Sequence, residues 1–185
     1  MAWKERRYWS STCRRAWTSR DWDRAIIPTP EANIARLLAH WRNRGRPVVH
    51  VRHCSTEADS PLRPELPGNA VKDEARPLPD EAQFTKSVNS AFIGTGLDEY
   101  LRERRIAALV VVGLVTDHCV STSVRMAANL GFNVTLVSDA TATFGRQGPD
   151  GAFYPAEQVH RINLASLNGE FCELRTTEEL LTEKT

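Results

Sequence analysis

Apolar residues follow two alternating spacings along most of this chain. Helical spacing predicts helices over 30–45, 97–105, 116–131 and 156–167, and short apolar runs predict strands over 47–53, 108–114, 133–140 and 171–176, before a last turn at 178–181. The strand at 108–114 (ALVVVGL) is apolar at consecutive positions, which is typical of a parallel strand covered by helices on both faces. The alternation predicts an α/β fold with a three-layer, doubly wound, mainly parallel sheet, in one domain over residues 1–185.

Two stretches between these elements carry signals of their own. Residues 55–83 are rich in proline, glutamate and aspartate. A loop of this length inside a compact domain is usually functional, so we expect a lid or the rim of a substrate pocket there.

Thr116 or Asp117 can cap the helix that follows the strand 108–114, and Gly131 can end it.

The beginning of the chain follows neither spacing. It holds four of the five tryptophans, namely Trp3, Trp9, Trp17 and Trp22, and residues 1–24 carry seven basic and three acidic side chains. Tryptophan and arginine together can stack on nucleic-acid bases, but the formal net charge of the whole chain is only +1. No apolar run approaches the ~20 residues that a membrane span needs. We therefore expect no nucleic-acid partner and no membrane partner.

The four cysteines are widely spaced and include no Cys-x-x-Cys pair; they are Cys13, Cys54, Cys119 and Cys172. This spacing is unlike that of a zinc knuckle or of the disulfide framework of a secreted protein. The basic N-terminus also lacks the apolar core of a signal peptide. These observations predict free thiols and a cytoplasmic protein.

Cys119 occupies a position where cysteine can react. It follows the strand 108–114 by about five residues and falls in the first turn of the next predicted helix, beside His118. Ligands bind beyond the carboxyl ends of parallel strands, and the partial positive charge of a helix N-terminus stabilises a thiolate there. A buried, inert cysteine is the alternative. For Cys54 and Cys172, packing is the better interpretation.

Three segments resemble one known family. GLVTDHCVSTSVRMAANLGFNVTLVSDATATF at 113–144 resembles the nucleophile segment of the isochorismatase-like cysteine hydrolases. This superfamily includes nicotinamidases, carbamoylsarcosine-type amidohydrolases and isochorismatases. FTKSVNSAFIGTGL at 84–97 resembles its lysine segment, and PEANIARLLAHWRNRGRPVVHVRH at 30–53 its first helix and second strand. The resemblance covers about residues 28–180 and implies relatives that commonly assemble as homo-oligomers.

The resemblance implies a catalytic set of cysteine, lysine and aspartate. Cys119 would attack the carbonyl of a small-molecule substrate, and Lys86 would keep the thiol ionised or help to carry the proton. The peptide bond Leu114–Val115 would be cis, so that the backbone amides of Val115 and Cys119 form the oxyanion hole. A cysteine at this position argues against isochorismatase activity itself, because enzymes that cleave a vinyl ether typically lack that nucleophile.

No metal or other cofactor is expected. Metal-dependent relatives carry an Asp-x-His…His cluster after the second strand, whereas this chain has HVRHCSTEADSPL there. His50 falls inside the predicted strand, and we expect His53 either at the rim of the pocket or in solvent. The absent cluster also makes nicotinamide a poorer candidate substrate.

The third catalytic residue of the family is missing. It is an aspartate that ends the first strand, in a segment that resembles LLVIDMQ. This chain has RRYWSSTCRRAWTSR at 6–20, which contains no carboxylate and no apolar run. The family's first strand lies between the second strand and the strand 108–114, so we expect residues 7–12 to take this central place in the sheet.

A shifted reading frame accounts for this departure. One set of synonymous codons for residues 7–27, read two bases later, translates as LLVVDVQKGLDEPGLGPRNN, an apolar strand that ends in aspartate. In that frame the aspartate codon straddles Ser11 and Thr12. We therefore interpret residues 7–27 as a frame-shifted reading of the family's first strand. The nucleotide sequence around codons 5–30 tests this interpretation.

Two functional interpretations remain open at this point. The first is a cysteine hydrolase that cleaves a small amide or related C–N bond through a thioester, with activity weakened by the missing aspartate. The second is a non-catalytic relative that binds a small molecule. The retained Cys119 and Lys86 favour the enzyme, and the missing aspartate favours the binding protein.

Overall fold

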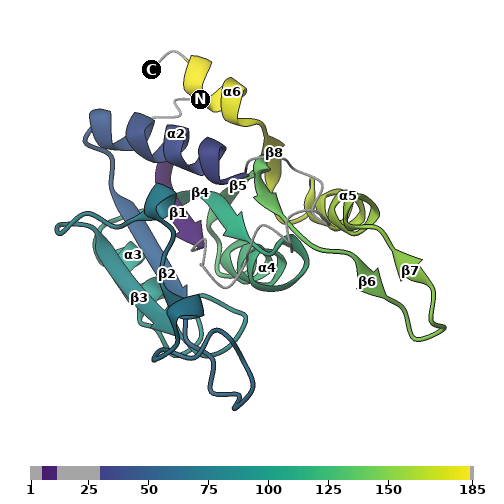
Figure 1. Cartoon of the computed structure of the whole chain (residues 1–185). Coiled ribbons are helices and arrows are strands. Elements are labelled where there is room, and N and C mark those ends of the chain that lie inside the picture. The colour runs from purple at the N-terminus through teal and green to yellow at the C-terminus, as the bar shows by residue number, and fades with distance from the viewer. Residues whose placement is uncertain (1–5, 12–29, 184–185) are drawn as a thin grey trace.

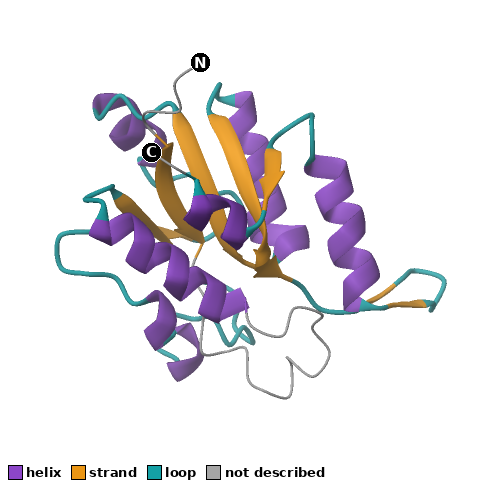
Figure 2. Cartoon of the chain, turned by 90° about the horizontal axis from the view of Figure 1, so that it is seen from above, coloured by secondary structure: helices purple, strands orange, loops and turns teal. Residues whose placement is uncertain are grey.

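The structure, a computed structural model, describes residues 6–11 and 30–183. A six-stranded parallel sheet lies at its centre, with helices on both faces (Figure 1 and Figure 2). The strand order is β3-β2-β1-β4-β5-β8. The strands are β1 (Arg6–Ser11), β2 (Val48–His53), β3 (Ala82–Lys86), β4 (Ala108–Leu114), β5 (Asn133–Ala142) and β8 (Glu173–Arg175). The arrangement confirms the predicted three-layer α/β fold.

Helices form the two outer layers. They are α2 (Pro30–Asn43), α3 (Leu97–Glu103), α4 (Ser121–Asn129), α5 (Ala156–Leu167) and α6 (Thr177–Thr182). Buried residues of α2 and α6 share one hydrophobic core, and buried residues of α3, α4 and α5 share the other. Within the described part of the chain, no helix is long and apolar enough to cross a membrane.

Strand β4 joins the two hydrophobic cores. Leu109 and Val111 belong to the core beneath α3 and α4, whereas Val110, Val112 and Leu114 belong to the core beneath α2. All five side chains are at most 5% exposed. Because alternate residues of a strand point to opposite faces, a continuous apolar run is required here, and the sequence pattern predicted this strand correctly.

Strand β1 takes the central position that the sequence predicted. Its backbone pairs in parallel with β2 on one side and with β4 on the other; Tyr8, for example, is in register with both Val48 and Val110. The shifted-frame interpretation concerns residues 7–27, of which residues 12–27, Cys13 among them, lie outside the described residues. The structure therefore places the backbone of this strand and leaves its reading frame a hypothesis.

Three strands were not predicted from the sequence. Among the described strands, β3 lies at the edge of the sheet and pairs with β2 alone. Its five residues mix polar and apolar side chains directly after the proline-rich loop. Strands β6 (Arg146–Gln147) and β7 (Phe153–Tyr154) form a two-stranded antiparallel hairpin that projects from the body (Figure 1). Such short strands bury few apolar side chains, so periodicity does not reveal them.

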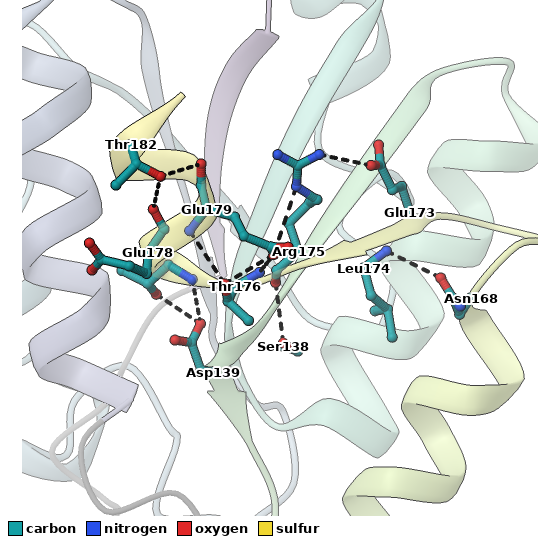
Figure 3. A network of polar contacts seen from close by, with 11 residues as sticks. Ser138, Asp139, Asn168, Glu173, Leu174, Arg175, Thr176, Glu178, Glu179 and Thr182 are labelled. Atoms are coloured by element: carbon teal, nitrogen blue, oxygen red, sulfur yellow. Dashed lines mark hydrogen bonds and ion pairs between the residues drawn. The ribbon is translucent and has the colours of Figure 1, made fainter. Parts of the chain in front are cut away.

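Asp139 of β5 is a structural residue that holds the C-terminal helix (Figure 3). Its Oδ1 atom accepts hydrogen bonds of 2.8 Å from both the backbone N–H and the hydroxyl of Thr177. Thr176 and Glu179 form a reciprocal capping box at the same helix start. The adjacent hydroxyl of Ser138 donates to the carbonyl of Arg175 at 3.2 Å. These contacts fix α6 against the end of the sheet.

Glu81 anchors the end of the long loop to the sheet and to α2. Its carboxylate accepts two hydrogen bonds from Arg42, at 2.7 and 2.8 Å, one of 2.8 Å from the backbone N–H of Leu78, and lies 2.8 Å from Nε2 of His50. The side chain of Glu81 is 7% exposed. Burial opposes its ionisation, but the bonds from Arg42, Leu78 and His50 outweigh burial and lower the pKa of Glu81 to about 2.

Glu81→Gln should destabilise the protein, because it removes the charge that accepts these bonds. We expect the free energy of unfolding at pH 7 to fall by about 2 kcal/mol, measured by urea denaturation. The stabilisation by ionised Glu81 is complete above the ordinary glutamate pKa of 4.5, which applies to the unfolded chain, and is lost as the pH falls towards about 2. The difference between variant and parent should therefore shrink over that interval.

An exposed pair in the same loop provides the matched control. Glu65 pairs with Arg63, and their side chains are 50% and 41% exposed. Glu65→Gln should change the unfolding free energy by less than about 1 kcal/mol. An equal loss in both variants would show that Glu81 has no special anchoring role.

Candidate active site

Cys119 and Lys86 come together at the carboxyl-terminal edge of the sheet. Cys119 lies in a π-helical turn, Thr116–Val120, which directly follows β4 and precedes α4. Lys86 is the last residue of β3. Its Nζ atom is 3.0 Å from the Sγ atom of Cys119. The two residues that the resemblance implied as catalytic are therefore in direct contact.

The surroundings of Lys86 fix its side chain. Lys86 is only 3% exposed. Its Nζ atom donates to the backbone carbonyls of Val88 at 2.8 Å and Asn89 at 3.0 Å. Carbonyl acceptors compensate an ammonium group for the water that burial removes. The Nζ atom is thereby held beside the sulfur of Cys119.

Asn89 is a neighbour of the pair that the sequence did not reveal. Besides its carbonyl contact with Lys86, its side-chain Oδ1 lies 3.6 Å from Sγ of Cys119. Asn89 lies in the segment 84–97 that resembles the family's lysine segment, so it follows Lys86 closely in sequence. Only the fold of the loop between them brings its side chain to the sulfur.

His53 also lies at the pair, at the end of β2. Its Nδ1 atom is 3.4 Å from Nζ of Lys86, so of the two positions expected for His53 the structure shows the one that adjoins the site. His50, by contrast, is 2% exposed and bonded to Glu81. Among the described residues, no group of three or more His, Cys, Asp or Glu side chains is placed to hold a metal ion.

The prediction that Thr116 or Asp117 caps a helix with its side chain is wrong. No side-chain cap exists at the start of the π-helical turn. The hydroxyl of Thr116 contacts Thr141 and His160 instead. The side chains of Thr116 and Asp117 bond instead to polar groups on neighbouring elements.

Asp117 links the turn to the hairpin. Its carboxylate accepts a bond of 2.8 Å from Nε of Arg146 in β6 and another from the hydroxyl of Thr143. Burial opposes ionisation of Asp117, but the bonds from Arg146 and Thr143 outweigh it and lower the pKa of this carboxyl. No local pattern in the sequence indicates this ion pair, because it joins residues far apart in the chain.

The backbone before the turn has the conformation that the resemblance implied. The peptide bond Leu114–Val115 is cis. The carbonyl of Val115 accepts hydrogen bonds from the amides of His118 and Val120, both at 3.2 Å. The assignment of the Val115 and Cys119 amides to an oxyanion hole stays a prediction.

The other described cysteines lie in unlike surroundings. Cys172 is buried, and burial raises the pKa of its thiol to about 11. Cys54 is half-buried with Sγ 3.8 Å from the side-chain oxygen of Asn69. Cys54, Cys119 and Cys172 are all free thiols, as the sequence predicted for them.

Comparison with known proteins establishes the family. The family profile of the isochorismatase domain matches residues 16–179. The chain is 40% identical over 169 residues to the uncharacterized isochorismatase family protein YrdC of Bacillus subtilis (strain 168), a match that spans 91% of this chain and 90% of that protein. A solved structure assigned to the same family, from Chromobacterium violaceum ATCC 12472, has a TM-score of 0.91 and 38% identity over 98% of this chain and 94% of that one. The chain belongs to the isochorismatase family of hydrolases.

One partial relative carries a reaction in its name. The ureidoacrylate amidohydrolase RutB of Agrobacterium fabrum (strain C58 / ATCC 33970) is 37% identical over 92 residues, which are 45% of this chain and 40% of that protein. The name of this relative describes an amidohydrolase, and the similarity covers less than half of either chain.

Proposed function

We propose that this protein is a cysteine hydrolase that cleaves a small amide or related C–N bond through a thioester on Cys119. The observation that carries the proposal is the 3.0 Å contact between Sγ of Cys119 and the buried Nζ of Lys86. An amidohydrolase among the relatives supports the bond type. Cys119 is partly exposed at the edge of the sheet where ligands of such folds bind.

The proposed reaction has two stages. In the first, the thiolate of Cys119 attacks the carbonyl carbon, the amides of Val115 and Cys119 hold the oxyanion, and the amine leaves after it takes up the proton that the Cys119 thiol released. In the second, water attacks the thioester, and the acid and the free thiol are released. The net change is the addition of one water across the C–N bond.

The first strand supplies no carboxylate that could carry a proton beside Cys119 and Lys86. The sequence has no carboxylate between Glu5 and Asp21. The family profile matches residues 16–179, so its match does not include β1. We therefore propose that the chain as written hydrolyses amides weakly, since general acid–base catalysis contributes about 10²–10⁴-fold.

The missing carboxylate favours a second candidate function, that of a binding protein. A protein with this fold and without the proton carrier could bind the same small molecule and release it unchanged. Under that alternative Cys119 would be an ordinary thiol, although the Lys86 contact would persist. The reactivity of the thiol therefore distinguishes the two functions.

Cys119 should react with iodoacetamide at neutral pH more than about tenfold faster than Cys54 or Cys172, because Nζ of Lys86 lies 3.0 Å from its sulfur and cysteines beside a cation are the reactive ones. Peptide mass spectrometry of partially alkylated protein measures the three rates in one sample. Cys172 should be slowest, since burial raises the pKa of its thiol to about 11.

Lys86→Met is the matched control for that measurement, because it keeps an unbranched side chain of similar length and removes the charge. It should bring the rate of Cys119 to within about threefold of the rate of Cys54. Equal rates for Cys119 and Cys54 in the unaltered protein would instead favour the binding protein.

A further inference from the structure

Three buried polar side chains lie behind the turn that carries Cys119. They come from three elements: Thr116 from the turn, Thr141 from β5 and His160 from α5. Thr116 and Thr141 are fully buried, and His160 is 6% exposed. The Oγ1 atom of Thr116 is 3.1 Å from Oγ1 of Thr141 and 3.0 Å from Nδ1 of His160. We call these three residues the Thr–His cluster.

The Thr–His cluster holds the turn at its first residue. The side chain of Thr116 is bonded to β5 and α5, while its backbone carbonyl accepts from the amide of Ser121 at the start of α4. Thr116 is therefore fixed from both sides. Cys119 follows three residues later in the same turn, so a shift of the backbone at Thr116 would be carried along the turn to Cys119.

The protonation state of His160 bears on which groups of the Thr–His cluster donate and which accept hydrogen bonds. Burial lowers the pKa of His160, which keeps the ring neutral, although a hydrogen bond with the backbone of Ser138 opposes this shift. A neutral imidazole has one donor and one acceptor nitrogen. A bond from the other ring N–H to the backbone of Ser138 would leave Nδ1 as the acceptor for the hydroxyl of Thr116.

If the Thr–His cluster served stability alone, apolar side chains of the same shape would serve about as well. Valine has nearly the shape of threonine, and replacing bonded polar groups by apolar ones is often close to neutral for stability. Removing one member, however, leaves its partners buried without a bond. A fully satisfied buried network enforces one arrangement of the elements that it joins. In this protein those elements are the cysteine turn, β5 and α5.

We propose that His160, acting through Thr116, is a positioning residue that holds the turn so that Sγ of Cys119 faces Nζ of Lys86. The inference rests on the proposed function of Cys119 as nucleophile. We expect loss of the Thr–His cluster to have a large effect on the reaction rate, although its bonds lie away from the sulfur. A misplacement of about 1 Å at a reacting atom can cost about 10²-fold in rate.

Thr116→Val tests the proposal most simply, since it removes the hydroxyl and keeps the shape. We expect the iodoacetamide rate of Cys119 to fall at least about fivefold, while the rate of Cys54 in the same molecule stays unchanged. Thr116→Ser, which restores the hydroxyl, should return the rate to within about twofold. His160→Leu should behave as Thr116→Val does.

Thr135→Val provides the matched control. Thr135 is also a buried threonine of β5, 3% exposed, and it pairs with Val110 towards the other end of the sheet. This variant should leave the rate of Cys119 unchanged. If Thr116→Val fails to fold, as judged by thermal unfolding, Thr141→Val carries the same test from the other end of the bond.

A second readout separates this inference from the proposed function. Deuterium exchange of the peptide that contains residues 116–121 should be faster in Thr116→Val and normal in Thr116→Ser. A slow Cys119 in the unaltered protein would reject the proposed function, and normal exchange in Thr116→Val would reject the Thr–His cluster as a positioning device. A folded Thr116→Val that alkylates at the parent rate would also overturn the inference.

Discussion

Replacement of residues 7–27 by LLVVDVQKGLDEPGLGPRNN should raise kcat/KM for small amides by about 10²–10⁴-fold. The replacement puts a carboxylate at the end of the central strand β1, between the end of β2 and the turn after β4. That carboxylate can carry the proton from the attacking thiol to the leaving nitrogen. Hydrolysis is measured as release of ammonia or amine from a panel of simple amides.

The control for this change separates chemistry from packing. The same replacement with asparagine in place of its aspartate restores the apolar strand but supplies no proton carrier. It should recover the stability of the restored chain and little of its activity. Equal activity from the aspartate and asparagine versions would assign the gain to packing alone.

Cys119→Ala should reduce hydrolysis by the restored chain at least about 10³-fold, because the reaction loses its nucleophile. Lys86→Met should also cause a loss of about 10²-fold or more, since the thiolate loses the cation 3.0 Å away. Both are measured as initial rates at saturating and at limiting substrate.

Cys54→Ser is the matched cysteine control. Cys54 is half-buried and its sulfur faces Asn69 rather than Lys86. Its exchange should leave the rate within about twofold of the parent. A comparable loss in Cys54→Ser and Cys119→Ala would show that the sequence and the structure point to the wrong thiol.

Strand β4 could be predicted because it is buried on both faces. β4 has to be apolar at every position, and such a run is visible in a single sequence. Strand β3 has one partner and the hairpin β6–β7 has none in the sheet, so neither needs a distinctive pattern. Short edge elements depend on pairing that the sequence does not display.

The sequence predicted some residues of the site and missed others. The place of Cys119 follows from topology, since it comes directly after a buried parallel strand. Lys86 was found by resemblance alone, because nothing local distinguishes it from another loop lysine. Asn89 and His160 approach the cysteine turn through long-range contacts that only the folded chain creates.

The first strand shows how backbone and side chains can disagree. Backbone hydrogen bonds of a parallel ladder need no particular side chains, so Arg6–Ser11 occupies the central position although its sequence is polar. The chemistry of the site does depend on side chains. A strand can therefore keep its place in the sheet and still lose its catalytic residue.

The central claim is that the first strand limits a reaction performed by Cys119. The most direct test is one comparison of four chains: the chain as written and the restored chain, each with and without Cys119→Ala. We predict that restoration raises the rate of amide hydrolysis at least about 10²-fold when Cys119 is present and has no effect in the Cys119→Ala background. The same gain in both backgrounds, or robust equal rates before and after restoration, would contradict the account.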